Sequence, residues 1–303
     1  MDIPVFLAIV ISLGAAVANA SMSLFIRKGS TNGKAVDAVF VVIGVNIVVL
    51  LPLVLLVYYP DYGLTRTSWI AFIAAGIFGT VLGRMCKFTS IHRIGASRTE
   101  PIVAAHAIIA TVLGVIILGE SLSPVHALGI ALIVGGVSVI AWETSSENSE
   151  DLSQRQVLLG ILLPLGGAVA YGWEPILASI GFAEGTPAPV GLIVKTVAAS
   201  IGFTMYLRWH NAVPSVASLR SPNMRWFILA GIANTLFILG YYVALELAPV
   251  NVVVPVITTN TLFVVLLSAI FMPRHLERVT WTLIIAATIV VVGVLMITTI
   301  GSA

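Results

Sequence analysis

LGAAVANASMSLFIRKG at residues 13–29 and LGGAVAYGWEPILASIG at residues 165–181 are two copies of one pattern. At a constant offset of 152 positions they share Leu, Gly, Ala, Val, Ala and a final Gly. Two further matches follow in the same order. WIAFIAAGI at 69–77 resembles WFILAGI at 226–232, and Pro101 corresponds to Pro255. Three ordered matches, at offsets of 152 to 155, indicate that the chain is an internal duplication.

The composition indicates that both copies lie in a lipid bilayer. Of the 303 residues, 59% are hydrophobic and only 9% are charged, whereas a typical soluble domain has about 25% charged residues. Long apolar runs cross the roughly 30 Å of hydrocarbon as helices, because lipid offers the backbone no other hydrogen-bond partners. Ten such spans are predicted, at residues 3–26, 36–58, 68–90, 98–118, 123–142, 157–180, 188–208, 225–245, 251–271 and 279–300.

One polar, acidic segment, ETSSENSEDLSQRQ, divides these ten runs five and five. We therefore predict a first five-helix repeat at residues 1–142, a linker at 143–156 and a second five-helix repeat at 157–303. Because five is odd, the second copy enters the membrane the opposite way up, an arrangement that places transporter sites between the halves near the midplane. The predicted fold is an all-α polytopic membrane protein, with ten transmembrane helices in two inverted five-helix repeats around a central cavity.

The basic residues predict the orientation in the membrane, because Lys and Arg gather on the cytoplasmic side. The gaps after spans one, three, five, seven and nine, with their adjoining helix ends, hold thirteen of the 15 Lys and Arg residues. Only Arg66 falls in a gap on the opposite side, and Lys195 lies inside a span. We predict a multi-pass protein of the cell membrane with both termini outside and the central linker in the cytoplasm.

Glu174 lies inside the predicted span 157–180, where an ionisable group is costly and is a functional candidate by default. At helical spacing it shares a face with Gly167 and Tyr171, and the equivalent face of the first span carries Asn19. Lys195 in the next span is expected at a similar depth. Two interpretations stay open. Glu174 and Lys195 form a structural ion pair, or Glu174 faces a cavity and binds a cationic group or a coupling proton.

A second group of polar residues extends the candidate site over both halves. Lys87 and His106 correspond to Tyr242 and Asn260, which favours a shared cavity over coincidence. Snorkelling of the Lys87 side chain to the basic interface stays open as the alternative. Asn234 continues the same polar wall. The predicted substrate-binding residues are Asn19, Lys87, His106, Tyr171, Glu174, Asn234, Tyr242 and Asn260, with Glu174 as the protonation candidate.

The sequence predicts neither an enzyme nor a metal or cofactor site. It has no HExxH, GxSxG or P-loop motif. Its five histidines are scattered, and its single cysteine, Cys86, excludes a disulfide within the chain. The net charge of +2 is too small to suggest a nucleic-acid partner. The expected partners are the bilayer, a small-molecule substrate and a proton as the candidate coupling ion.

The stretch IHRIGASRTEPIVAAHAIIATVLGVIILGESLSPVHALGIALIVGGVSVI at 91–140 resembles the ten-helix EamA-type branch of the drug/metabolite transporter superfamily. The resemblance lies in a small-residue turn, a proline in helix four, the Gly119–Glu120 pair, which we interpret as a helix-end feature, and a Gly-rich fifth helix. It implies a cavity lined mainly by helices 1, 3, 4, 6, 8 and 9, which leaves Lys195 on helix seven off the lining. It also implies alternating access for small polar metabolites, often in the export of amino acids.

These observations predict a secondary active transporter that exports an amino acid or a related metabolite by alternating access. One alternative is a channel or a divalent-cation carrier, which would need more carboxylates along the lining helices than this chain carries. The other is a non-transporting membrane scaffold, which would not need polar residues at matching depth in both halves.

The predicted orientation can be tested at the C-terminus. A reporter that is active only in the cytoplasm, fused after Ala303, should be inactive, and the same reporter inserted in the 143–156 linker should be active. An active fusion at Ala303 would show that the basic-residue bias does not set the orientation.

Overall fold

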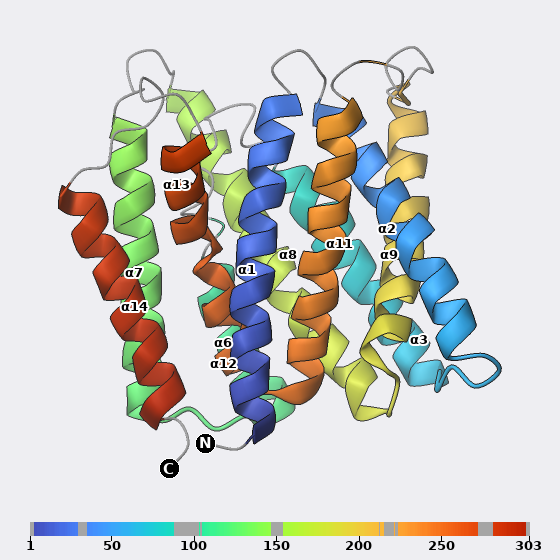
Figure 1. Ribbon diagram of the computed structural model, residues 1–303, viewed down its shortest axis with the longest axis horizontal. Coiled ribbons are helices and arrows are strands. Elements are labelled where there is room, and N and C mark those ends of the chain that lie inside the picture. Colours follow the sequence, from blue (N-terminus) through green and yellow to red (C-terminus); the bar gives the residue numbers. More distant parts are fainter. Residues whose placement is uncertain are drawn as a thin grey trace.

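A computed structural model describes residues 3–29, 35–87, 103, 105–146, 154–211, 213–214, 221, 224–271 and 281–300. All regular secondary structure in these ranges is helical, and the helices stand side by side across the molecule (Figure 1). The end of the predicted third span, the start of the fourth and the middle of the 143–156 linker lie outside the described residues. The helices are α1 (Ile3–Gly29), α2 (Ala35–Val57), α3 (Arg66–Ala75), the π-helix η1 (Gly76–Gly83), α6 (His106–Leu113), the π-helix η2 (Gly114–Leu118), α7 (Pro124–Ser146), α8 (Gln154–Ala183), α9 (Ala188–Trp209), α11 (Met224–Leu247), α12 (Val250–Thr258), α13 (Asn260–Phe271) and α14 (Trp281–Ile300).

Five segments of the described chain are long and apolar enough to cross a membrane. They are Ile3–Ile26, Asp37–Val57, Arg66–Lys87, Ala188–Trp209 and Met224–Leu247. Three shorter apolar segments, His106–Leu118, Pro124–Val139 and Val250–Val264, fall within other predicted spans. The chain is therefore a multi-pass membrane protein, and the full set of ten spans stays a prediction.

The predicted span 251–271 is two helices, because the chain makes a tighter turn at Thr259. The Thr259 N–H donates to the Val256 carbonyl, three residues back (3.1 Å). The hydroxyl groups of Thr258 and Thr259 donate to the carbonyls of Val254 and Val256 (2.8 and 2.7 Å). Such side-chain bonds compete with the helical backbone bonds and bend helices. A second helix, α13, then begins at Asn260.

The helix contacts follow a two-repeat layout. Helix α1 of the first half packs along α11 of the second half. Likewise, α8 of the second half packs along α3 and η1 of the first half. Three further pairs join equivalent helices of the two halves: α2 with α9, α6 with α12, and α7 with α14. The last pair stands at one edge of the molecule (Figure 1). Helix α1 begins and α14 ends at the same end of the molecule (Figure 1).

Three glycines let η1 approach its neighbours closely. A Cβ on Gly76 would lie 2.5 Å from the Lys195 carbonyl oxygen of α9. A Cβ on Gly79 would overlap the Glu174 carboxylate of α8, and one on Gly83 would lie 3.0 Å from the Tyr171 ring. Small residues permit such approaches between membrane helices, and π-helical turns are frequent at functional sites. This contact brings Glu174 and Lys195 to the centre of the helix packing.

Glu120 joins the two halves at a helix end. Its carboxylate accepts hydrogen bonds from the backbone N–H groups of Val250 and Asn251 (2.7 and 3.0 Å), the first residues of α12. The preceding Gly119 adopts a left-handed conformation (φ 70°) that ends η2. Burial raises the pKa of Glu120, and the two backbone hydrogen bonds oppose that rise. The Gly119–Glu120 pair therefore has a structural role at a helix end, where it caps a helix of the other half.

The glycine contact predicts the effect of one added methyl group. Gly76→Ala should destabilise the protein by about 1–3 kcal/mol, because the new Cβ meets the α9 backbone, which cannot rotate away as a side chain could. Gly44→Ala on α2 is the matched control, since nothing lies within 4 Å of its Cβ position. Thermal unfolding in detergent measures both. Equal melting temperatures of Gly76→Ala and the wild type would contradict the close approach.

Candidate functional site

A buried ion pair lies at the centre of the candidate site. The ammonium group of Lys195 on α9 donates to Oε1 of Glu174 on α8, and both side chains are buried. Tyr242 on α11, also buried, donates its hydroxyl to the same Oε1 (3.4 Å). Its ring centroid lies 4.6 Å from the Lys195 ammonium, a cation–π distance. Three helices of the second half thus meet at one carboxylate oxygen.

The local sequence explains why this pair forms. Helices α8 and α9 are consecutive, and only residues 184–187 separate them. Thr186 and Glu246 fix this connection: the Thr186 hydroxyl donates to the Gly63 carbonyl (2.6 Å), and the Ala188 N–H at the start of α9 donates to the Glu246 carboxylate (3.0 Å). Because α8 and α9 are antiparallel and joined by a short connection, Glu174 and Lys195 lie at a similar distance from that connection.

A second polar group, from α2, η1 and α11, adjoins the pair. Asn46 accepts at Oδ1 from the Asn234 amide (3.2 Å) and from the Thr235 hydroxyl (2.8 Å). Arg84, directly after η1, donates from Nη2 to Asn234 Oδ1 (3.4 Å). Asn46 and Asn234 are buried, so each hydrogen bond satisfies a group that would otherwise be costly inside the protein.

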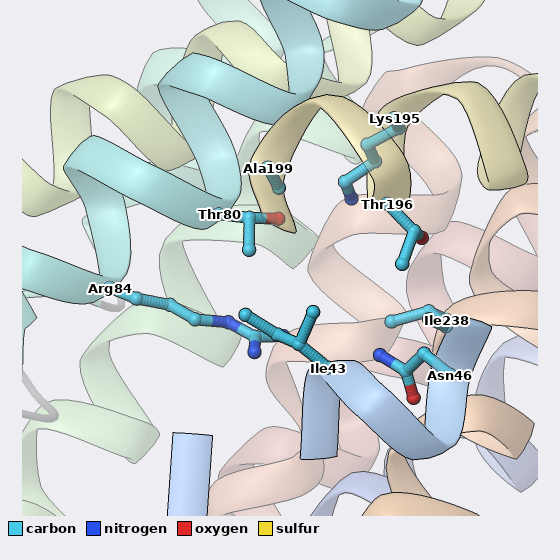
Figure 2. Close-up of a pocket in the computed structure, with 8 residues that line it drawn as sticks. All are labelled: Ile43, Asn46, Thr80, Arg84, Lys195, Thr196, Ala199 and Ile238. Atoms are coloured by element: carbon cyan, nitrogen blue, oxygen red, sulfur yellow. The ribbon is translucent and has the colours of Figure 1, made fainter. Parts of the chain in front are cut away.

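A small pocket with a cavity volume of about 20 Å³, room for about one water molecule, lies between α2, η1, α9 and α11. Figure 2 shows Arg84 and Lys195 reaching toward the same space from opposite walls. The two halves contribute four lining residues each. Those of the first half are Ile43, Asn46, Thr80 and Arg84, and those of the second are Lys195, Thr196, Ala199 and Ile238.

His106 and Tyr171 form a separate contact one helical turn from Glu174. Their rings meet edge to face, with centroids 6.2 Å apart. Nδ1 of His106 lies 2.9 Å from the Val103 carbonyl oxygen. His106 is the first residue of α6, and Asn260, its counterpart in the duplication, is the first residue of α13.

The structure brings together some of the predicted site residues and separates others. Glu174 and Tyr242 lie in the ion-pair group with Lys195, and Asn234 lies in the asparagine group. None of the three predicted residues is among those that line the pocket. The Lys87 backbone lies against Gly167 of α8, two turns from Glu174. Asn19 is half-buried on α1, a helix that contributes no residue to the pocket.

Four polar residues of the pocket were not among the predicted site residues: Asn46, Thr80, Arg84 and Thr196. Arg84 is an ionisable residue inside a predicted span, so its position alone made it a candidate. Asn46 could have been found, because it is a polar residue inside the apolar run 38–57. Thr80 and Thr196 carry no such signal, since threonine is common in membrane helices, where its hydroxyl can bond the preceding turn. Thr196 makes that bond, to the Leu192 carbonyl (2.7 Å). The described residues contain no group of three His, Cys, Asp or Glu side chains that could hold a metal.

The ion pair predicts a double-mutant cycle. Glu174→Gln and Lys195→Met should each destabilise the protein by about 3–5 kcal/mol, because each leaves a buried charge unpaired. The double variant should lose much less stability than the sum of the two single losses, because it leaves no unpaired charge in the protein interior. SDS titration in mixed micelles measures the free energies of unfolding. Glu184→Gln, at an exposed glutamate, is the control, and strictly additive losses would contradict direct pairing.

Comparisons with known proteins agree with this architecture. The protein "Probable glucose uptake protein GlcU" of Staphylococcus epidermidis is 28% identical over 184 residues, which are 56% of this chain and 62% of that protein. The match therefore spans less than two thirds of that relative. A solved structure, described as "Crystal structure of protein", superposes with a TM-score of 0.79 over 97% of this chain and 96% of its own. At 14% identity, that likeness shows the fold alone.

The profile of the EamA-like transporter family matches the chain twice, over residues 6–142 and 158–299. The two matches cover both copies of the duplicated pattern. They also cover every residue of the ion pair, the asparagine group and the pocket. This protein belongs to the EamA-like transporter family.

Proposed function

We propose that this membrane transporter is a secondary active transporter that moves a small polar organic solute by alternating access. The observation that carries the proposal is the pocket, because each half of the chain supplies four of its eight lining residues. A rocking movement of one half against the other would change every contact across the pocket. Such a movement exposes one site to each side of the membrane in turn.

The proposed solute is an amino acid or a related metabolite, moved outward across the cell membrane. The pocket offers two charged groups, one amide and two hydroxyls, which suit a small polar molecule in a more open state of the transporter. A sugar is the second candidate, since the relative that matches over part of its length is named a probable glucose uptake protein. The proposed orientation, with the termini outside, follows from the distribution of basic residues.

Glu174 is the proposed protonation site. Its carboxylate holds Lys195 and Tyr242 together, and a proton on Glu174 would remove the charge that binds the lysine. Lys195 lines the pocket, so its release would change the charge that the solute meets. Protonation, ion pairing and the pocket would then be linked through one side chain.

Transport in proteoliposomes tests this proposal. A thermal-shift screen of amino acids, related metabolites and sugars first selects a ligand, and its flux is then measured with and without an imposed pH gradient. Wild-type protein should carry the ligand faster when a gradient is present. Glu174→Gln should lose that dependence, because its side chain no longer binds a proton in this range.

Glu184→Gln is the control, because Glu184 is exposed and is not among the residues that line the pocket. Flux no faster than in protein-free vesicles, for every ligand that stabilises the protein, would overturn the transport proposal. A Glu174→Gln variant that keeps the full pH dependence would overturn only the role of Glu174.

A further inference from the structure

Arg84 brings a charge into the pocket that no acidic residue of the described ranges balances. Its helix segment, Arg66–Lys87, is one of those long and apolar enough to cross a membrane. Among the described residues its side chain has one hydrogen-bond partner, Asn234, at the long distance of 3.4 Å. A guanidinium group carries five N–H donors and stays charged at any physiological pH. Most of these donors are therefore available to a molecule in the pocket.

The other cation of the pocket is already balanced. Lys195 is paired with Glu174, which does not itself line the pocket. None of the eight lining residues is acidic, so two cations and one nearby carboxylate leave one uncompensated positive charge. Arg84 is half-buried, so its charge loses part of its hydration, and a bound anion would offset that cost.

Asn46 adds a donor to the same wall. Its Oδ1 already accepts from Asn234 and Thr235, which orients the amide so that Nδ2 faces the pocket (Figure 2). Thr80 lies between Arg84 and Lys195 and adds a hydroxyl group. Thr196, whose proton is bonded to the Leu192 carbonyl, can only accept. The wall near Arg84 is thus built mainly of hydrogen-bond donors.

We propose that the pocket binds a small organic solute through a single carboxylate group, with Arg84 as its main ligand. This inference rests on the proposed function and names the solute's chemical class. Two parallel N–H···O bonds from a guanidinium match a carboxylate in geometry as well as in charge. Asn46 donates a further hydrogen bond, and Thr196 accepts from a hydroxyl or amino group elsewhere on the solute. One uncompensated charge matches one carboxylate group, and a neutral sugar would leave Arg84 unpaired.

Ligand binding to the purified full-length protein tests this assignment. The probes are acetate, L-lactate and pyruvate, each paired with its neutral amide, L-alanine and L-leucine, each paired with its cationic amide, and glucose. At constant ionic strength, at least one acid should raise the melting temperature, and its amide should bind at least about tenfold more weakly. Arg84→Gln should weaken binding of the acid by a similar factor. Arg84→Lys should bind it more tightly than Arg84→Gln does, because a point charge remains.

Asn46→Asp is a second variant that keeps the acceptor for Asn234 and Thr235 but adds a negative charge at the wall. This variant should also bind the acid more weakly than the wild type does. The test therefore does not depend on whether Arg84→Gln folds. Gly44→Ala, on the same helix with open space at its Cβ, should bind like the wild type.

The inference is overturned if no acid stabilises the protein, if an amide binds as well as its acid, or if both variants keep full acid binding. These results are separable from the proposed function. Glucose flux that persists in Arg84→Gln proteoliposomes would support transport while overturning carboxylate recognition. Arg84-dependent acid binding with no flux of that acid would support recognition while overturning transport.

Discussion

The ion pair between Glu174 and Lys195 is the interaction on which the arrangement of the site depends. Each charge would cost several kcal/mol to bury alone, and the pair is stable only where the helices bring both ends together at one depth. The glycines of η1 make this possible, because Gly76 lies against the Lys195 backbone and Gly79 against the Glu174 side chain. The pair, the close helix approach and the position of Lys195 at the pocket therefore form one structural unit.

Much of this architecture could be predicted from local patterns. The duplication is visible because the copies LGAAVANASMSLFIRKG and LGGAVAYGWEPILASIG keep their small residues, and the family profile matches both halves. The contact of Glu174 with Lys195 follows from counting residues on either side of a short connection. Such counting works for consecutive antiparallel helices, because their depths are tied by the chain itself.

Contacts between distant helices could not be predicted in this way. Arg84 bonds to Asn234, which lies 150 residues away, and Asn46 bonds to Thr235, 189 residues away. Nothing in the sequence shows which faces of α2, η1 and α11 meet. The family resemblance also directed attention to helices 1, 3, 4, 6, 8 and 9, whereas the pocket lies between the second, third, seventh and eighth segments of the predicted order. Asn19 was chosen by analogy with Tyr171, but the two copies have different surroundings.

The duplicated halves share a frame, but their charges differ, and this difference has a consequence for the proposed cycle. Glu174 corresponds to Met22, and at the offset of 155 that relates Lys87 to Tyr242, Arg84 corresponds to Leu239. Arg84 therefore belongs to the first half, and the Glu174–Lys195 pair belongs entirely to the second. While Glu174 is unprotonated, a rigid movement of the two halves would keep the pair intact and change its distance from Arg84. A carboxylate held by Arg84 would then experience a different field in each state, although no contact within either half is broken. In the proposed cycle, the divergence of the two copies would therefore let a bound anion meet a different charge environment on each side of the membrane.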